Sequence, residues 1–457
     1  MSALWTSAEI AAATGGTASA DFTIGGVTFD SREVGPGDLF VAMPGTAHDG
    51  HQFVAGAFAS GAAAALVSQP VDGPHVLVAD TSEALNKLGQ AARERCGATV
   101  IGVTGSVGKT STKEALFGAL DRCCPGRVHR SVKSYNNHTG VPLSLARMPR
   151  DCRFAVLEMG MNHAGEIAEL TALVRPHVAL ITAIAPAHIE MLGSLEAIAD
   201  AKAEIFAGLE PDGVAIIPND SDQRDRLLKA ARRRADRIIS FGSGDADIHA
   251  VHAVSAGSGG SLITAALLER ELTFTISQRG DHWVSNALAV LATVEAVSAD
   301  VAIAGLALAD MDGLTGRGAR HVIDLNGGTA LIIDESYNAN PASMAATLKS
   351  LGDEHDVERR IAVLGPMREL GQQADALHAE LATPILDAKV DELVLIGPDM
   401  APLADAIGTS VAVHRAANVD DACAKLLALL RPGDAVLVKA SNSVGLAALV
   451  DRVTRGR

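Results

Sequence analysis

Residues 104–112, with the sequence TGSVGKTST, follow directly after the apolar run at 99–103 and constrain the fold of this chain more than any other segment. Their order predicts a buried strand, a glycine-rich turn and a helix that opens with KTS. In such a turn, backbone N–H groups and the helix N-terminus face the phosphates, the lysine spans the outer phosphates and a hydroxyl reaches Mg²⁺. Gly105 and Gly108 have no Cβ, so the backbone can approach the phosphates closely. We therefore predict a nucleoside triphosphate site.

The loop is a shortened form of the usual phosphate-binding pattern, which has a glycine where this chain has Val103. An ordinary glycine-rich turn between a strand and a helix is the alternative interpretation. Residues 112–120 favour the phosphate loop because their apolar side chains recur at helical spacing. The loop residues predicted to contact ATP are Thr104, Gly105, Ser106, Val107, Gly108, Lys109, Thr110 and Ser111.

The composition predicts a soluble globular protein of about three domains, since the chain has 457 residues, 48% hydrophobic and 20% charged. No uninterrupted apolar run is long enough to span a bilayer, and the first residues lack the pattern of a signal peptide. Five cysteines without CxxC spacing argue for a reducing compartment and against zinc, so we expect a cytoplasmic protein. A net charge of −16 and only 3% aromatic residues argue against binding to nucleic acid.

The order of apolar runs predicts an α/β protein of three domains. We expect a small mixed α/β N-terminal domain over 1–86, and a central domain over 87–315 with a mostly parallel sheet and flanking helices. A Rossmann-like α/β domain follows over 316–457. The predicted central strands lie at 99–104, 154–158, 178–185, 213–217 and 237–241. The predicted C-terminal strands lie at 330–333, 361–364, 393–396 and 435–438. Ligands collect beyond the carboxyl ends of parallel strands, so two facing domains would form a cleft.

Three residues near the predicted strand ends are candidates for metal binding or catalysis. Glu158 ends the strand at 154–158, where a carboxylate beside the phosphate loop completes Mg²⁺ coordination or merely caps the next segment. His188 follows another apolar strand, and although a lone histidine is more often structural, this position makes a functional role equally plausible. Lys202 lies on a predicted helix and, from the pattern alone, is a surface lysine.

Polar segments elsewhere are candidates for substrate contacts. The amides of residues 136–140, NNHTG, suit a sugar, a phosphate or a peptide carboxylate, as do those of many loops. Asn286 precedes the predicted alanine-rich helix at 287–297, so a role at a helix N-terminus is the alternative. Arg317 stands at the predicted domain junction, where its guanidinium could reach a γ-phosphate across the cleft. The alternative is a structural arginine in the hinge between the domains. Residues 334–341, DESYNANP, again place polar groups at a strand end, where they suit ribose and base.

Taken in order, these segments resemble the Mur ligases of peptidoglycan synthesis, a superfamily that also includes folylpolyglutamate synthetases. The matching motifs are DSR, GDLFVAMPG, DGHQF, TGSVGKTS, NNHTGVP, LEMGMNHAGEI, APAHIEMLGS with AKAEIF, GDHWVSNALA, TGRGAR and DESYNANPASM. They cover almost the whole chain. Within the family, EMGMNHAGEI and DESYNANP resemble the member that adds D-alanyl-D-alanine to UDP-N-acetylmuramoyl-tripeptide. The shortened phosphate loop is typical of the superfamily.

The resemblance implies ATP and Mg²⁺ as cofactors and a role for each matching residue. Thr110, Glu158 and His188 would serve the metal, and Lys202 matches a lysine that is carbamoylated in several members. The implied catalytic residues are Lys109, His188, Lys202 and Arg317. The further residues implied to contact ATP are Asn286, Arg317, Asp334, Tyr337 and Asn338. The residues implied to bind the other substrates are Ser31, Arg32, Asn136, Asn137, Thr139, Lys439 and Ser441.

One departure concerns the incoming dipeptide. The chain reads VKASNS near its C-terminus where the family commonly reads closer to VKGSRS, so Asn442 replaces an arginine that would pair with the dipeptide carboxylate. The resemblance assigns the UDP-sugar to 1–86, ATP to 87–315, and closure over ATP with dipeptide binding to 316–457. It implies no nucleic acid, no membrane span and a monomer.

The implied reaction forms an acyl phosphate from ATP and the tripeptide carboxylate, and the dipeptide amine then displaces phosphate. Another Mur ligase or a polyglutamate synthetase is the nearest alternative. The alternative from another class is a nucleotide-binding protein that is not a ligase, such as a motor, a transporter subunit, a signalling switch or an inactive scaffold. The sequence leaves open whether the third residue of the tripeptide is diaminopimelate or lysine.

Overall fold

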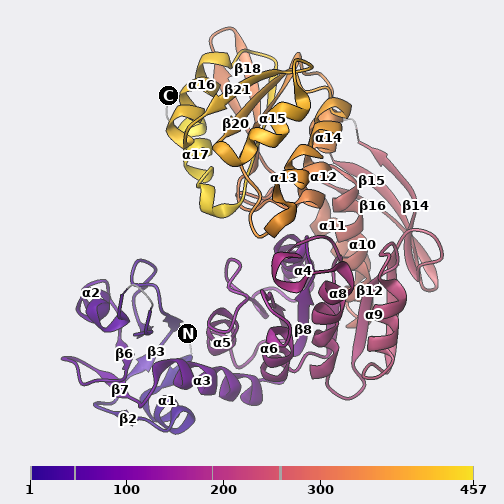
Figure 1. The fold of residues 1–457 in the computed structure, drawn as a ribbon. Helices are drawn as coiled ribbons and strands as arrows, with labels where there is room; N and C mark the ends of the chain where they lie inside the picture. Colours follow the sequence, from indigo (N-terminus) through magenta and orange to yellow (C-terminus); the bar gives the residue numbers. More distant parts are fainter. Residues whose placement is uncertain (1–2, 46–47, 188, 257–259, 456–457) are drawn as a thin grey trace.

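The computed structural model describes residues 3–45, 48–187, 189–256 and 260–455. They form three α/β units in chain order, each built on its own main sheet (Figure 1). Among the described residues, no helix combines the length and apolar character needed to cross a membrane.

The N-terminal unit is a five-stranded sheet with the order β2-β7-β6-β5-β4, in which only β2 pairs antiparallel. Its strands are β2 (Thr17–Ala18), β4 (Gly26–Thr28), β5 (Asp38–Val41), β6 (Ala64–Val67) and β7 (His75–Leu77), and a separate pair joins β1 (Trp5–Thr6) to β3 (Thr23–Ile24). Its helices are α1 (Ser7–Thr14), η1 (Gly50–Phe53), α2 (Val54–Ala59) and α3 (Thr81–Arg95). Helix α3 begins at the side-chain cap of Asp80 and packs on both α1 and α5 (Gly140–Ala146), so the boundary predicted at residue 86 falls within it.

The central unit is a nine-stranded sheet with the order β16-β15-β14-β13-β12-β11-β8-β10-β9. The strands are β8 (Thr99–Thr104), β9 (Val128–Arg130), β10 (Phe154–Glu158), β11 (Val178–Ile181), β12 (Val214–Pro218), β13 (Arg237–Gly242), β14 (Ile248–Ser255), β15 (Ser261–Leu267) and β16 (Arg270–Ile276). Pairing is parallel from β9 to β14 and antiparallel from β14 to β16. The parallel strands are almost continuously apolar because helices cover both of their faces.

The helices of the central unit divide between those two faces. Helices α4 (Lys109–Cys123), α10 (Asp281–Ala296) and α11 (Val301–Ala309) pack in one apolar cluster, and α5, α6 (Glu166–Val174), α8 (Leu195–Ala203) and α9 (Arg224–Ala231) pack in the other. Two short helices, α7 (Ile189–Leu192) and η2 (Glu204–Gly208), flank α8. The strand predicted over 178–185 is too long. Strand β11 ends at Ile181 because the chain then turns toward the glycine-rich loop, where Ala183 O accepts a hydrogen bond from Ser106 N at 2.8 Å.

The C-terminal unit is a six-stranded sheet with the order β17-β18-β22-β19-β20-β21, parallel except for the β17–β18 pair. Its strands are β17 (Ala319–Leu325), β18 (Gly328–Glu335), β19 (Arg359–Leu364), β20 (Glu392–Ile396), β21 (Ala412–Ala416) and β22 (Asp434–Lys439). Its helices are α12 (Pro341–Gly352), η3 (Gly371–Gln373), α13 (Ala374–Ala379), α14 (Ala382–Asp387), η4 (Pro398–Met400), α15 (Ala401–Ile407), α16 (Val419–Leu429), η5 (Asn442–Val444) and α17 (Ala447–Arg455).

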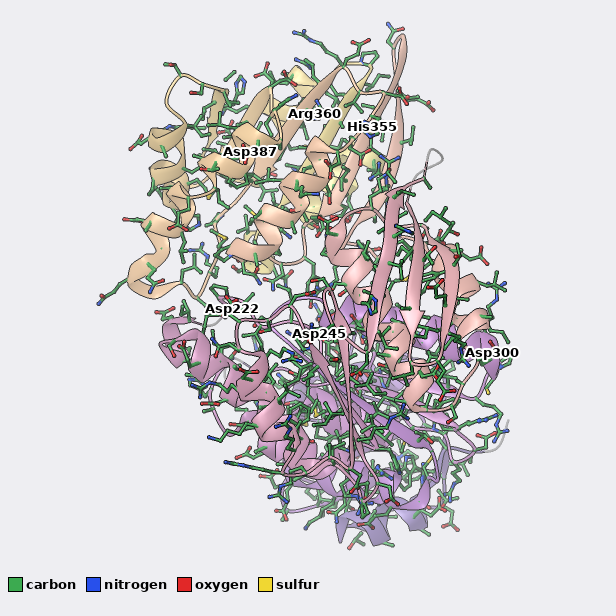
Figure 2. The ribbon with its side chains drawn as sticks, turned by 90° about the vertical axis from the view of Figure 1, so that its right-hand side faces the viewer. Asp222, Asp245, Asp300, His355, Arg360 and Asp387 are labelled. Atoms are coloured by element: carbon green, nitrogen blue, oxygen red, sulfur yellow. The ribbon has the colours of Figure 1, made fainter. Side chains whose placement is uncertain are left out.

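The C-terminal unit stands on the central unit, whereas the N-terminal unit extends to one side (Figure 1). The side view places Arg360 and Asp387 of the C-terminal unit above Asp245 and Asp300 of the central unit (Figure 2). Several polar contacts cross this seam, among them a backbone hydrogen bond from Glu190 N to Glu369 O at 3.4 Å. Arg279 Nη1 lies 2.9 Å from Glu354 Oε2, Lys349 Nζ lies 3.1 Å from Asp281 Oδ2, and the Tyr337 hydroxyl contacts the hydroxyl of Ser134.

Candidate functional site

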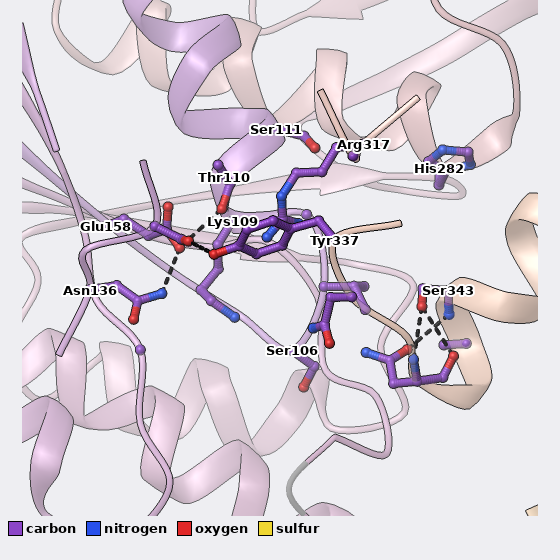
Figure 3. A pocket seen from close by; sticks show the side chains of 18 of the residues that line it. Ser106, Lys109, Thr110, Ser111, Asn136, Glu158, His282, Arg317, Tyr337 and Ser343 are labelled. Carbon is purple, nitrogen blue, oxygen red and sulfur yellow. Dashed lines mark hydrogen bonds between the residues drawn. The ribbon is translucent and has the colours of Figure 1, made fainter. Parts of the chain in front are cut away.

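A cavity of about 560 Å³ lies between the central and C-terminal units (Figure 3). The glycine-rich loop, the end of β10 and the start of α10 line it from one side. The turn before β17, the end of β18 and the start of α12 line it from the other. Its lining includes Ser106, Val107, Gly108, Lys109, Thr110, Ser111, Asn136, Asn137, Glu158, Asn286, Arg317, Tyr337, Asn338 and Lys439, all of them predicted site residues.

The loop keeps its shape because two glycines and Thr182 fit closely together. Gly105 has φ +150° and Gly108 has φ +84°, and a Cβ at Gly105 would lie 2.0 Å from Thr182 Oγ1. The same hydroxyl donates a hydrogen bond to Val107 O at 2.6 Å. A Cβ at Gly108 would lie 2.7 Å from Asn286 Oδ1 on α10. Only glycine fits both positions, so the backbone of the loop can approach Thr182 and Asn286 this closely.

Lys109 opens α4 at the centre of the cavity (Figure 3). Its Nζ donates a hydrogen bond to Gly105 O at 2.6 Å. Burial lowers the pKa of this ammonium, the negative charge of Glu158 partly offsets that effect, and the charge of Arg317 lowers the pKa further. An anion between Lys109 and Arg317 would relieve their repulsion.

Glu158 ends β10 beside Thr110, and its side chain is buried. Its Oε1 accepts hydrogen bonds from Thr110 Oγ1 at 3.2 Å and from Asn136 Nδ2 at 2.7 Å. Its Oε2 is buried without a hydrogen-bond partner among the described residues. A buried, unpartnered carboxylate oxygen beside a threonine hydroxyl is a donor set that suits a hard cation such as Mg²⁺.

Lys202 is not the surface residue that its sequence pattern suggests. It lies near the end of α8, where its side chain is only 1% exposed. Burial moves the pKa of its ammonium well below the usual range, and the charge of Lys109 lowers it further. No carboxylate of the described residues lies within ion-pair distance of its Nζ. The sequence pattern failed here because α8 packs in the core of the central unit. The predicted His188 lies outside the described residues.

Arg317 and Tyr337 form the opposite wall of the cavity. The guanidinium carbon of Arg317 stands 4.3 Å from the centre of the Tyr337 ring, and the Tyr337 hydroxyl reaches Ser134 of the central unit. Asn286 lies within α10, which begins at Asp281, so its suggested role before a helix N-terminus is wrong. Its carboxamide instead faces Gly108 of the loop.

Asp334, a predicted ATP contact, lies behind the wall rather than in its lining. Its buried carboxylate accepts hydrogen bonds from Gly316 N at 2.8 Å, Ser336 N at 3.1 Å and Ser336 Oγ at 2.6 Å. The turn that carries Arg317 is thereby fixed to the end of β18. Thr104 likewise lies behind the glycine-rich loop, as the buried last residue of β8.

Other predicted substrate contacts are spread over the molecule. Arg32 pairs with Asp30 on the N-terminal unit, with 87% of its side chain exposed, and this pairing lowers the pKa of Asp30 to about 2. Its neighbour Ser31 lies in the same turn. Thr139 immediately precedes α5, outside the cavity lining. The hydroxyl of Ser441 accepts a hydrogen bond from Arg368 N at 3.0 Å.

Lys439 belongs to both the C-terminal sheet and the cavity. Its Nζ donates a hydrogen bond to Asn338 O at 2.9 Å and lies 3.4 Å from Glu335 Oε2. Burial lowers the pKa of this ammonium, and Glu335 opposes the shift.

Several residues that line the cavity were not predicted from the sequence. They are Ser134, Gly160, Met161, Asn162, Glu166, His282, Trp283, Gly316, Glu335, Asn340, Ala342, Ser343, Ala346 and Thr347. Most of them lie within a recognised motif. His282 and Trp283 lie in GDHWVSNALA, and burial lowers the pKa of His282. Their place in these motifs was the available sequence signal. Ala346 and Thr347 of α12 lie outside the motifs, and only the tertiary fold brings them to the cavity.

Three family models together match most of the chain. The model described as "Mur ligase family, catalytic domain" matches residues 23–98, "Mur ligase middle domain" matches 103–294, and "Mur ligase, glutamate ligase domain" matches 321–442.

Individual relatives match at nearly full length. The chain is 34% identical over 449 residues to the UDP-N-acetylmuramoyl-tripeptide--D-alanyl-D-alanine ligase of Synechocystis sp., covering 95% of this chain and 93% of that relative. It superposes on MurF from Acinetobacter baumannii with a TM-score of 0.85 and 30% identity, covering 98% of both chains. MurF ligase from Thermotoga maritima, solved in complex with ADP, gives a TM-score of 0.77 and 27% identity, covering 93% of this chain and 96% of that one. These matches run through all three units of the fold.

Proposed function

Because this chain belongs to the Mur ligase family, we propose that it is an ATP-dependent amide ligase that joins D-alanyl-D-alanine to UDP-N-acetylmuramoyl-tripeptide in peptidoglycan precursor synthesis. The observation that carries the proposal is the cavity in which the glycine-rich loop and Glu158 face Arg317 and Tyr337. It joins a phosphate-binding loop, a carboxylate suited to a metal and a cation from a second unit, which are the parts that phosphoryl transfer from ATP requires.

The proposed reaction has two displacement steps. An oxygen of the tripeptide's terminal carboxylate attacks the γ-phosphorus of ATP, the bond from that phosphorus to the bridging oxygen breaks, and ADP leaves. The neutral amine of D-alanyl-D-alanine then attacks the acyl carbon, and the bond from that carbon to the phosphate oxygen breaks. Phosphate leaves, and the nitrogen releases a proton as the amide forms. A closed cleft protects the acyl phosphate from water.

Each step brings anions together, so the residues of the cavity act mainly through charge. Lys109 and Arg317 would neutralise the phosphate oxygens from opposite sides of the cleft. Thr110, Glu158 and His188 would hold Mg²⁺, which neutralises charge on the transferring phosphoryl group when it is bound. Asn286, Tyr337 and Asn338 would contact the nucleotide, with Asp334 acting through the turn that it fixes.

Lys202 is proposed to carry a carbamate. Its neutral amine would attack carbon dioxide and release a proton, which replaces a buried cation by an anion facing Lys109. The lowered pKa and the burial of Lys202 support this, because only the neutral amine reacts. Native mass spectrometry tests the proposal. We expect the mass of one added carboxylate group, absent from Lys202→Met, and an unmodified wild-type lysine would contradict it.

The remaining substrate-binding roles are assigned to the three structural units in turn. Residues 1–86, with Ser31 and Arg32, would bind the UDP-sugar, and residues 87–315 would bind ATP, with Asn136, Asn137 and Thr139 beside the tripeptide. Residues 316–457 would close over ATP and bind the dipeptide through Lys439 and Ser441. We place the protein in the cytoplasm as a monomer, and its five free thiols are consistent with a reducing compartment.

A donor and acceptor panel tests the proposed activity. The protein should release phosphate from ATP only when UDP-N-acetylmuramoyl-tripeptide and D-alanyl-D-alanine are both present. Tripeptides ending in diaminopimelate and in lysine are compared in the same assay to identify the preferred third residue. Equal release with a folate and glutamate would instead identify a polyglutamate synthetase, and release without any acceptor would favour a simple ATPase.

A further inference from the structure

Lys113 is a fully buried lysine outside the cavity lining. It lies on α4 three positions after Thr110, so both side chains lie on the same face of the helix. Burying an ammonium costs several kcal/mol unless charged or polar partners compensate for the lost water. The partners of Lys113 therefore indicate what the residue does.

Among the described residues, the ammonium of Lys113 has three partners. It lies 3.1 Å from Glu114 Oε1 and 3.6 Å from Glu158 Oε2, and it donates a hydrogen bond to Lys133 O. Glu114 is itself paired with Arg130 at 2.8 Å. Of the two carboxylates, Glu114 balances charge near the surface, whereas Glu158 faces the cavity.

Lys113 restrains both oxygens of Glu158. It is the cation next to Oε2, the oxygen without a hydrogen-bond partner among the described residues. It also fixes Lys133, a residue with φ +52°, in the segment that carries Asn136, whose Nδ2 binds Oε1. The same segment carries Ser134, which contacts Tyr337 across the cleft.

We propose that Lys113 is a positioning residue for the metal site, and that it acts through Glu158. Its buried charge holds the carboxylate in one orientation, with Oε2 available for Mg²⁺. This inference rests on the proposed function only in requiring a Mg²⁺–nucleotide complex at the glycine-rich loop. Residues that support metal ligands in this way affect metal affinity about 10–100-fold when changed.

Calorimetric titration of ADP with and without Mg²⁺ tests the inference without relying on turnover. For the wild type, Mg²⁺ should tighten ADP binding. In Lys113→Met this enhancement should fall by about tenfold or more, while ADP binding without Mg²⁺ stays within about twofold, since the loop is unchanged. Lys113→Arg should recover part of the enhancement. Arg122→Met, which removes an exposed cation from the same helix, is the matched control and should bind as the wild type does.

A double-mutant cycle shows whether Lys113 acts through Glu158. In a Glu158→Gln background, Lys113→Met should cause no further loss of the Mg²⁺ effect. This comparison stays available if Lys113→Met alone fails to fold, because the double variant leaves neither buried charge unpaired. An undiminished Mg²⁺ enhancement in Lys113→Met, or a further loss in the Glu158→Gln background, would overturn the inference. A wild type that binds no ADP would overturn the proposed function as well.

Discussion

At the scale of single residues, Lys109 is the side chain on which the nucleotide site most depends. Its partly buried ammonium lies where the charge of Arg317 acts on it, and it donates only to Gly105 O among the described residues. Lys109→Ala should lower turnover by at least about 10²–10³-fold because a preorganised charge on the phosphates is lost. The thermal unfolding midpoint should not fall, since the substitution removes a partly desolvated cation that Arg317 repels. Phosphate release and calorimetry measure the two effects, and retained turnover would contradict the assigned role.

His129 makes stability depend on pH. It lies in β9, and its Nε2 is 2.6 Å from Ser144 O. Burial lowers the pKa of His129 to about 4, so the unfolded chain takes up a proton at higher pH than the folded protein does. The contribution of His129 to stability is therefore fully present above its unfolded pKa of about 6.5 and is lost as pH falls toward 4.

The expected cost for this one group is about 2 kcal/mol between pH 7 and pH 5. Urea unfolding of the wild type and of His129→Gln at both pH values measures it. The variant should lose less stability than the wild type over this interval. An equal loss in both proteins would show that His129 titrates normally in the folded state.

At the scale of elements, the junction of the glycine-rich loop with α4 holds the nucleotide site together. Gly108 has φ +84° and approaches Asn286 closely, so Gly108→Ala should destabilise the fold by about 1–2 kcal/mol and weaken ADP binding. Gly118, within the same helix and with no atom near its missing Cβ, is the control. Gly118→Ala should stabilise the helix by about 0.5–1 kcal/mol and leave ADP binding unchanged. Equal effects of the two substitutions would contradict the close fit at Gly108.

Elements with strong apolar runs could be predicted from the sequence, and elements with mixed patterns could not. Strands β8 and β10 match their predicted ranges, because both are buried on two faces. Strand β17 was missed, since one of its faces is open and Val322 is 71% exposed. Strand β21 was missed for a similar reason, as a short edge strand with polar residues.

The residues of the candidate site likewise fall into those whose position could be predicted from the sequence and those whose position could not. Residues of the loop are contiguous in sequence, so their shared position was predictable. The burial of Lys202 and the position of Asp334 behind the cavity depend on how α8 and β18 pack. The local sequence pattern does not indicate this packing.

At the scale of the whole molecule, the seam between the central and C-terminal units places Arg317 opposite the loop. Glu354 is buried there and pairs with Arg279 of the central unit and with Arg320 of its own unit. Glu354→Ala should cost about 3–5 kcal/mol, because it leaves two cations without their partner. Arg279→Ala should cost less, since Glu354 retains both hydrogen bonds from Arg320. Denaturant unfolding ranks the variants, and a larger loss in Arg279→Ala would contradict this description of the seam.

The central claim is that ATP activates a carboxylate within this cleft, and an isotope transfer tests it most directly. UDP-N-acetylmuramoyl-tripeptide labelled with ¹⁸O in its terminal carboxylate is incubated with ATP and D-alanyl-D-alanine, and the released phosphate is analysed by mass spectrometry. If the carboxylate attacks the γ-phosphorus, each phosphate released from labelled substrate carries one ¹⁸O atom from that carboxylate. Unlabelled phosphate, formed while the amide product accumulates, would contradict the claim.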